Sequence, residues 1–482
     1  MAFYSHSAIC EMLSKTMPFT PTASQGVAIQ ALSSLLLSQD AQPVLLINGY
    51  AGTGKTSLMR AFCDVVSMLK CPISLMAPTG RAAKVLSERT GMPAYTIHKV
   101  IYRQESITDI YGHFDINYNR GQGTIFVVDE ASMISDSMGA ETEFGSGRLL
   151  TDLLSFVFSK PRCKLLFIGD PAQLPPVGLN IAPALDQEVL RSFGLDVQSV
   201  WLTDVVRQSL ESDILSNANY LRDVIENNPE YVGYPRLSAL PGADVERLSG
   251  SELIETLISC NDRYGTENTL VVTRSNKRAN RFNQGIRNTV MFREEEITRG
   301  DLLIVSKNNY LWLSLNSDEN SKEKNNDFIA NGDIAEVVRV GGYQEMYGLR
   351  FADVSLRFLE HEDIDIDVKI ILSVLNSDYP KLTNEDERVL YEAVMLDYED
   401  IHDKRKLIKS LRQDIWLNAL QVKFAYAVTC HKAQGGQWDV VFVDVGYVPE
   451  EQMTTEFFKW LYTAITRAKK KVYLVNFSDE YF

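Results

Sequence analysis

The sequence lacks the features that mark secreted and membrane proteins. It has only six cysteines in 482 residues, and no two of them form a Cys-x-x-Cys pair, which argues against a disulfide framework and against a zinc ribbon. The opening segment MAFYSHSAICEMLSKT has no basic stretch followed by an apolar one, and no run reaches the roughly 18 apolar residues that a membrane span needs. We therefore expect reduced, mostly buried thiols, no membrane contact and a cytoplasmic location.

Positive charge is also scarce. Lys and Arg total 48 against 63 Asp and Glu, a net charge of −15, whereas proteins that bind nucleic acid through its phosphates are usually basic. The acidity is uneven, because residues 353–403 hold 15 acidic and 4 basic residues and so account for −11 of the total. Nucleic-acid binding depends on the local charge along a binding track rather than on the net charge.

Short apolar, β-branched runs alternate with helical patterns along most of the chain. Continuous apolar strands separated by helices are typical of parallel sheets that are covered on both faces, so we predict an α/β fold. The runs fall into two groups, before about residue 195 and after about residue 265, which predicts two α/β domains with a cleft between them. The predicted strands are 43–48, 73–77, 124–128, 164–169, 269–273, 440–445 and 471–476.

Two segments depart from this alternation and are predicted to be inserts. Residues 296–375 contain short strands and turns, which predict a small β-barrel, and residues 376–414 form a charged helical pattern. A smaller insert is expected at about 103–121. The predicted domains are 1–195 for the first, 196–295 with 415–482 for the second, and 296–414 for the inserted one.

The clearest motif is Gly49-Tyr-Ala-Gly-Thr-Gly-Lys55-Thr56, which fits the phosphate-binding pattern G-x-x-x-x-G-K-[S/T] between an apolar strand and a helical pattern. Glycines let backbone amides surround phosphates, Lys55 adds a positive charge, and the Thr56 hydroxyl suits Mg²⁺. The alternative is a glycine-rich turn without a ligand. The full motif in its expected context favours an ATP site.

A second strand, IFVVDEAS, ends in the adjacent carboxylates Asp129 and Glu130. Acidic residues at a strand end are often merely solvated. Beside a phosphate loop, however, Asp129 suits the Mg²⁺ shell and Glu130 suits activation of the attacking water, so we expect ATP hydrolysis rather than binding alone.

The segment LLFIGDPAQLPPVG at 165–178 resembles motif III of the superfamily 1 helicases, and the other motifs follow in that family's order. The matching segments are PFTPTASQ at 18–25, APTGRAAKVL at 77–86, TIH at 96–98, LTDVVRQS at 202–209, AYAVTCHKAQGGQWDVVFVD at 425–444 and LYTAITRAKKKVYLV at 461–475. Together they resemble the RecD-like branch, which includes the Dda-type helicases. The resemblance implies two RecA-like P-loop NTPase domains, with a small β-hairpin insert in the first and an SH3-like β-barrel insert in the second.

The resemblance also implies the roles of residues at an ATP site. Gln25 is expected to read adenine, Gln173 to sense the γ-phosphate, and Arg207 and Arg467 to act as arginine fingers, with a surface salt bridge as the alternative for either arginine. Gln437 stands where many members have Glu, which puts a ribose contact in doubt. The expected ATP-binding residues are Gln25, Gly49, Tyr50, Ala51, Gly52, Thr53, Gly54, Lys55, Thr56, Ser57, Gly435 and Gln437, with Thr56 and Asp129 on Mg²⁺.

A second implied set would hold single-stranded nucleic acid by its backbone. It consists of Pro78, Thr79, Gly80, Arg81, His98, Thr429, His431 and Lys432. A satisfied core histidine is the alternative for both histidines. Tyr111, Phe114 and Tyr118 form a candidate pin for splitting duplex, and an ordinary hairpin that packs its rings on the first domain is an equal alternative.

These features predict an ATP-dependent DNA helicase that moves 5′ to 3′ and meets single-stranded DNA and duplex junctions, with recombination or repair proteins as possible partners. One alternative is a translocase that remodels complexes without separating strands. Another is a RecD-type subunit of a recombination or exonuclease complex that has no nuclease of its own. A plain nucleotide-binding switch is disfavoured, because it would leave the two candidate fingers without a use.

Overall fold

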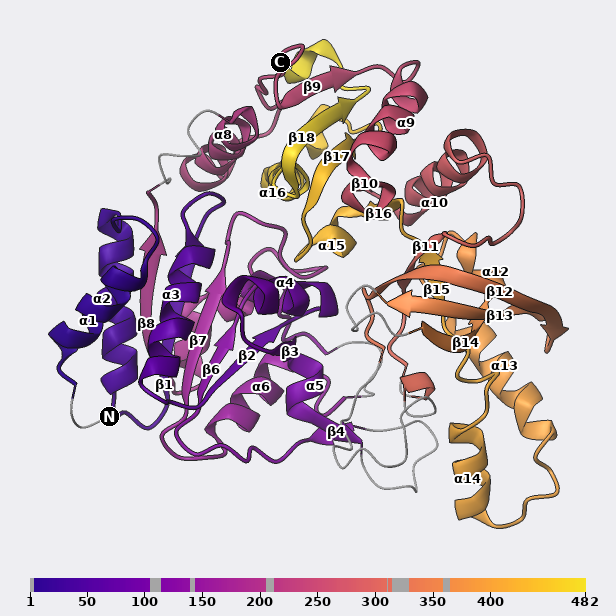
Figure 1. Cartoon of the computed structure of the whole chain (residues 1–482), viewed down its shortest axis with the longest axis horizontal. Coiled ribbons are helices and arrows are strands. Elements are labelled where there is room, and N and C mark those ends of the chain that lie inside the picture. Colours follow the sequence, from indigo (N-terminus) through magenta and orange to yellow (C-terminus); the bar gives the residue numbers. More distant parts are fainter. Residues whose placement is uncertain are drawn as a thin grey trace.

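A computed structural model describes residues 4–104, 114–138, 144–204, 212–309, 311–313, 329–358 and 365–482. Three large sheets dominate these residues (Figure 1): a six-stranded parallel sheet, a five-stranded parallel sheet and a five-stranded antiparallel sheet. In the view of Figure 1 the first sheet lies at the lower left, the second above it, and the third to the right. Within the described residues, no helix is both long and apolar enough to cross a bilayer. All six cysteines are free thiols, and four of them are buried, as predicted.

The first sheet confirms the prediction of strands covered on both faces. Along β1 (Pro43–Gly49), Leu45 and Ile47 enter one hydrophobic core, while Val44 and Leu46 enter another. One core is shared with α1 (His6–Thr16), α2 (Ala23–Leu37) and α3 (Lys55–Met68), and the other with α5 (Ile97–Ile101), α6 (Leu149–Phe158) and α7 (Gln187–Ser192). The strand order is β3 (Ala94–Thr96), β2 (Ile73–Ala77), β6 (Ile125–Val128), β7 (Lys164–Gly169), β1 and β8 (Asp196–Leu202).

The second parallel sheet carries the C-terminal motifs. Its order is β16 (Ala427–Thr429), β10 (Thr269–Thr273), β17 (Trp438–Asp444), β18 (Ala468–Val475) and β9 (Val245–Leu248). Its accompanying helices are α8 (Asp213–Asn227), α9 (Leu253–Tyr264), α10 (Asn276–Gly285), α15 (Cys430–Ala433) and α16 (Thr455–Ile465). The central strand β10 is buried at every residue, as its continuous apolar sequence predicts.

The third sheet is a small antiparallel sheet whose two edges meet. Its order is β14 (Asp365–Ile371), β13 (Leu349–Phe358), β12 (Ile334–Met346), β11 (Leu302–Val305) and β15 (Val422–Phe424). Leu420 N donates to Lys369 O at 2.7 Å, and Ile371 N donates to Leu420 O at 2.9 Å, which joins the segment before β15 to β14. The helices α12 (Leu372–Leu375), α13 (Asn384–Leu396) and α14 (Lys404–Arg412) follow β14, where a charged helical segment was predicted.

Two predicted domain boundaries are wrong. Strand β8, placed in the second domain by the boundary at residue 196, pairs in parallel with β1 of the first sheet. It alternates buried and exposed residues, as an edge strand does, so it lacks the apolar run that marks the other strands. Likewise β15 pairs with β11 of the third sheet, so the inserted unit extends past residue 415 to Phe424.

The smaller insert begins and ends as an antiparallel pair. Strands β4 (Tyr102–Gln104) and β5 (Phe114–Ile116) pair with Tyr102 opposite Ile116. Tyr111, one of the three pin candidates, lies outside the described residues.

Candidate nucleotide site and nucleic-acid interface

The phosphate-binding motif forms the turn between β1 and α3. Gly52 and Gly54 have φ angles of 78° and 80°, a left-handed conformation that glycine adopts without strain. A Cβ on Gly49 would lie 3.1 Å from Leu202 Cβ and from Lys55 Cγ, so the chain is tightly wrapped at this point. The turn therefore leads directly into the N-terminus of α3, where unpaired backbone amides attract anions.

Lys55 lies over this turn. Its Nζ donates to Gly49 O at 2.5 Å and to Tyr50 O at 2.8 Å, and it lies 3.8 Å from Asp170 Oδ2. Asp170 follows β7 in the segment that resembles motif III, but it was not among the predicted site residues. Burial raises the pKa of this carboxyl, while the charge of Lys55 and a hydrogen bond from Tyr462 act in the opposite direction.

Tyr462 joins the two parallel-sheet domains at this point. Its hydroxyl donates to Asp170 Oδ2 at 2.7 Å and accepts from Ala51 N at 2.9 Å. The side chain comes from α16, and the two residues that it contacts come from the phosphate loop and the end of β7. One buried hydroxyl therefore connects the second domain to the nucleotide site.

The predicted metal and water-activating residues follow β6. Burial, and then the charge of Glu130, raise the pKa of Asp129 to about 6, while Lys55 and Arg89 lower it. Glu130 has a φ of 52°, which is uncommon for a residue with a side chain, and its backbone N donates to Asp129 Oδ1 at 2.9 Å. Two neighbouring carboxylates with little solvent favour a bound cation, because it relieves both desolvation and repulsion.

Three polar side chains at the ends of β1, β6 and β7 have buried oxygens with no hydrogen-bond partner among the described residues: Asn48 Oδ1, Ser132 Oγ and Gln173 Oε1. Such groups are rare unless a ligand or water completes them. The carbonyl oxygens of Asn48 and Gln173 need a donor, which water in a metal shell or an attacking water supplies. Among the described residues, no group of three or more His, Cys, Asp or Glu side chains is arranged so that it could hold a metal ion. A site of Thr56 and Asp129 alone fits Mg²⁺, which keeps waters and phosphate oxygens as its other ligands.

The second domain also forms hydrogen bonds to the loop after β7. Leu174 N donates to Thr463 Oγ1 at 2.9 Å, and Gln434 Nε2 donates to Leu174 O at 2.8 Å. The buried side chain of Arg467 donates from Nε to Thr463 O at 3.1 Å and from a terminal nitrogen to Gly436 O at 3.2 Å. Within the described residues it has no carboxylate partner, so the alternative of a surface salt bridge is wrong for Arg467.

Several predicted nucleotide contacts are placed differently or cannot be placed. Arg207 lies outside the described residues. The buried amide of Gln25 accepts from Thr22 N at 3.0 Å and donates to Thr53 O at 3.0 Å, so it links the start of α2 to the phosphate loop. An adenine contact by Gln25 stays a prediction.

Two arginines that the sequence did not single out lie at the site. Arg89, at the end of α4 (Gly80–Thr90), donates to Thr56 Oγ1 at 3.1 Å and also to Gln437 Oε1. Arg222, on α8, places its guanidinium 4.8 Å from the ring centre of Tyr50, and its Nε and one terminal nitrogen are buried without a partner in the described part of the chain. Neither belongs to a recognisable local motif, so no sequence signal marked them.

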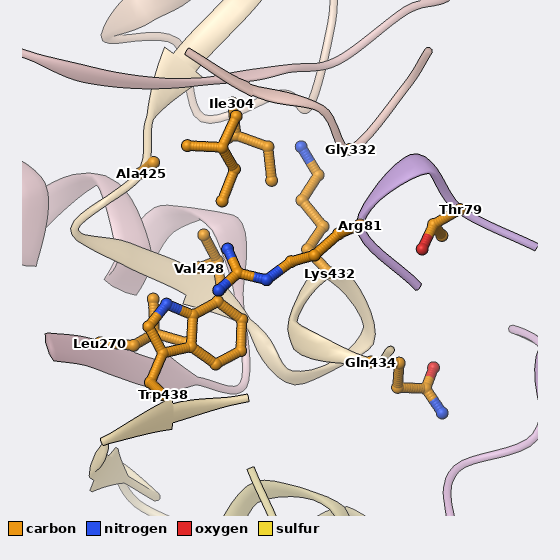
Figure 2. A pocket seen from close by; sticks show the side chains of 11 residues that line it. Thr79, Arg81, Leu270, Ile304, Gly332, Ala425, Val428, Lys432, Gln434 and Trp438 are labelled. Atoms are coloured by element: carbon orange, nitrogen blue, oxygen red, sulfur yellow. The ribbon is translucent and has the colours of Figure 1, made fainter. Parts of the chain in front are cut away.

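Three of the eight predicted nucleic-acid residues, Thr79, Arg81 and Lys432, line a pocket where the three sheets converge (Figure 2). Thr79 and Arg81 come from the start of α4, and Lys432 from α15, while Ile304 and Gly332 come from the third sheet and the turn before β12. Figure 2 shows the guanidinium of Arg81 over the indole of Trp438, and the two are 4.0 Å apart. Trp438 was not predicted.

The cations of this pocket are partly desolvated. Burial lowers the pKa of Lys432 to about 8, and its Nζ lies 3.3 Å from Ser306 Oγ. Thr79 Oγ1 accepts from Ala82 N and so begins α4, and a Cβ on Gly80 would overlap the Asp333 carboxylate. A side chain at position 80 would therefore displace the Asp333 carboxylate where α4 meets the third sheet.

The structure favours the packing alternative for His98 and Phe114. The His98 ring lies 5.6 Å from Tyr102 and 5.1 Å from Phe144, and burial lowers its pKa to about 4. Phe114 is only 8% exposed and stacks on Phe144 at 4.9 Å. Tyr118, by contrast, is 69% exposed, with Arg103 4.2 Å from its ring. Burial also lowers the pKa of His431.

Known proteins resemble this chain over most of its length. A family model described as an AAA domain matches residues 23–226, and one described as a UvrD-like helicase C-terminal domain matches residues 424–475. The ATP-dependent RecD2 DNA helicase of Deinococcus radiodurans is 23% identical over 441 residues, which cover 89% of this chain. The ATP-dependent DNA helicase dda of Enterobacteria phage T4 is 22% identical over 453 residues, which cover 89% of this chain and 93% of that protein.

The length of these relatives differs. The chain spans 46% of the RecD2 relative, about half its length. Among solved structures, the Pif1 helicase from Bacteroides in complex with ADP-AlF3 and single-stranded DNA aligns with a TM-score of 0.47 and 14% identity, covering 95% of this chain and 93% of that one.

Proposed function

Because the chain belongs to the RecD-like branch of the superfamily 1 helicases, we propose that it is an ATP-dependent DNA helicase. It hydrolyses ATP between the two parallel-sheet domains, moves 5′ to 3′ along single-stranded DNA and separates duplex at junctions. The observation that carries the proposal is the contact of Tyr462 with both Ala51 and Asp170. A protein that only binds nucleotide has no need of a second domain that reaches the phosphate loop.

At the nucleotide site each residue has a distinct task. The amides of the phosphate loop and Lys55 bind the phosphates; Thr56 and Asp129 would hold Mg²⁺, which would supply further positive charge at the phosphates. Glu130 orients and deprotonates the attacking water, and the unpartnered Oε1 of Gln173 accepts a hydrogen bond from that water. The half-buried carboxylates and the orphaned oxygens at the strand ends support these roles.

The second domain contributes positive charge that stabilises the negative charge developing on the phosphoryl group in the transition state. Arg467 is held by backbone carbonyls rather than by a carboxylate, so its charge is not neutralised within the described residues. Arg222 adds two buried donors beside Tyr50. Preorganised cations of this kind stabilise a transition state more than the bound substrate.

Movement along DNA follows from opening and closing between the domains. The pocket of Figure 2 is lined by both parallel-sheet domains and by the third sheet, so a change in their separation alters its shape. Thr79, Arg81 and Lys432 would hold backbone phosphates there without reading bases. A role in DNA recombination or repair, with proteins of those processes as partners, fits a non-specific track of this kind.

The proposal is tested with Lys55→Ala. We expect this variant to lose single-strand-stimulated ATP hydrolysis and unwinding, because the phosphates lose their positive partner. Lys15→Ala, at an exposed helical position far from the motif, is the matched control and is expected to keep both activities. Duplexes with a 5′ tail or a 3′ tail, in DNA and in RNA, are compared with wild-type protein. Unwinding of 3′-tailed duplexes alone would refute the polarity, and normal turnover by Lys55→Ala would refute the site.

A translocase that does not separate strands is the second candidate. The packing of Phe114 in the aromatic cluster favours it, since a pin needs an exposed ring. Of the two pin candidates within the described residues, Tyr118 is the exposed one, so Tyr118→Ala discriminates. A helicase that uses this ring loses unwinding of forked duplex while its ATP hydrolysis on single strands continues. A translocase of this kind unwinds forked duplex neither as wild type nor as the variant, and its ATP hydrolysis on single strands is unchanged by the substitution.

A further inference from the structure

Arg89 bridges the predicted metal site to the second domain. From the last turn of α4, one terminal nitrogen donates to Thr56 Oγ1 at 3.1 Å, and the other donates to Gln437 Oε1. Its charge also acts on Asp129, where it opposes the rise in pKa. The guanidinium therefore touches one predicted Mg²⁺ ligand and acts electrostatically on the other.

The same bridge continues to the nucleic-acid pocket. The backbone oxygen of Gln437, the residue whose side chain holds Arg89, accepts from Arg81 at 3.4 Å. Arg81 lies over the ring of Trp438, the next residue along the chain, at 4.0 Å. A run of direct contacts thus leads from Thr56 through Arg89, Gln437 and Arg81 to Trp438, and it crosses between the first and second domains.

Mg²⁺ and the guanidinium compete electrostatically at this place. A divalent cation on Thr56 Oγ1 and Asp129 would share an oxygen with a positively charged group, and two cations at such a separation repel each other strongly outside bulk water. Binding of a metal-nucleotide complex at Thr56 therefore favours departure of the guanidinium from that oxygen. The side chain of Gln437 then either loses its hydrogen bond to Arg89 or moves together with the guanidinium.

We infer that Arg89 is a positioning residue that couples occupancy of the nucleotide–metal site to the grip of the Arg81–Trp438 pair on single-stranded nucleic acid. The inference rests on the proposed function and deepens it, since it names a physical link between the two sites. Coupling between sites is reciprocal, so DNA binding must alter affinity for the metal-nucleotide complex by the same factor.

The test uses Arg89→Gln, with Arg191→Gln as the matched control on a surface ion pair of the same domain. One measurement is the Mg²⁺ concentration that gives half-maximal binding of a fluorescent, non-hydrolysable ATP analogue. The other is the affinity for fluorescein-labelled oligothymidine with and without that Mg²⁺-analogue complex. Neither measurement depends on turnover.

We expect Arg89→Gln to bind the analogue at about fivefold less Mg²⁺, because a competing positive charge is gone. We also expect the ratio of oligothymidine affinities measured with and without the Mg²⁺-analogue complex to fall close to one. Arg191→Gln is expected to behave as wild type in both measurements. A change in opposite senses, tighter metal binding with weaker coupling, is not the result of a general loss of structure.

A second variant keeps the inference testable if Arg89→Gln does not fold. Gln437→Ala keeps the guanidinium beside Thr56 but breaks its link to the second domain, so it is expected to lose coupling with a smaller change in the Mg²⁺ midpoint. Coupling that survives in Arg89→Gln, or an unchanged or higher Mg²⁺ midpoint, overturns the inference. Wild-type protein that binds no Mg²⁺-analogue complex overturns the proposed function, and the inference with it.

Discussion

The nucleotide site and the nucleic-acid pocket are both built between domains, yet they bury charge of opposite sign. At the nucleotide site the partly or fully buried carboxyls of Asp129 and Asp170 have raised pKa values. At the pocket, burial lowers the pKa of Lys432 to about 8. Burial therefore destabilises the negative carboxylates of the nucleotide site, which a metal cation would neutralise. It likewise destabilises the positive charge of Lys432 in the pocket, which backbone phosphates would neutralise.

The comparison explains why the net charge of −15 did not exclude nucleic acid. A bound phosphate interacts mainly with charges within a few side chains of it, because salt at ordinary ionic strength screens interactions between exposed charges beyond about 10 Å. The arrangement can be tested by removing or changing one charge at a time.

The largest effect is expected for Arg467, which we propose supplies positive charge to the nucleotide site from the other domain. Arg467→Gln is expected to lower the rate of DNA-stimulated ATP hydrolysis by about 10³-fold, because the guanidinium acts mainly on the transition state. Affinity for the ATP analogue should change much less. Steady-state kinetics and direct binding measure the two quantities. A rise in KM with an unchanged kcat would show that Arg467 contributes only ground-state binding.

Asp129→Asn tests the cost of burying a carboxylate. The folded pKa of about 6 lies above the usual value, so the ionised form destabilises the free protein at pH 7, and this penalty fades as the pH falls below 6. We expect the variant to be more stable than wild type at pH 7 by on the order of 1–3 kcal/mol. The gain should shrink at pH 5.

Thermal or urea denaturation without nucleotide or Mg²⁺ measures this difference. The same variant is expected to lose Mg²⁺-dependent binding of the ATP analogue, so stability and function change in opposite directions. Equal stability of the two proteins at pH 7 would contradict the idea that this carboxylate awaits a cation.

The smallest effect is expected at Lys432, in the region of opposite charge. Its folded pKa of about 8 lies below the usual value for lysine, so the charged form is lost as the pH rises through 8, and affinity for single-stranded DNA should fall over pH 7–9. Lys432→Arg should remove this pH dependence. Lys432→Ala should reduce the salt dependence of binding by about one counterion.

Binding isotherms between about 50 and 200 mM salt provide the measurement for Lys432. The affinity is expected to be modest and to fall steeply with salt, because the track is a narrow basic strip on an acidic protein. Binding that does not vary with salt would contradict a phosphate track in this pocket.

Local motifs made the first half of the nucleotide site predictable. The turn at 49–56 requires glycine at Gly52 and Gly54, and its lysine and threonine follow within the same turn, so neighbouring letters specify it. Asp129 and Glu130 follow a buried strand in the same local way. Edge strand β8 and the end of the inserted unit at Phe424 were not predictable, because an edge strand carries no continuous apolar run.

The sequence by itself determined the α/β class, the phosphate loop, the pair of carboxylates after β6 and the set of helicase motifs, because each depends on residues adjacent in the chain. Only the tertiary structure decided that Tyr462 reaches Asp170, that Arg89 joins Thr56 to Gln437, and that Arg81 lies over Trp438. Apart from Arg89 and Thr56, which are 33 residues apart in the first domain, these partners are separated by about 300 residues or more and lie on different domains. Their pairing follows from how the sheets pack against one another, and no local pattern encodes that.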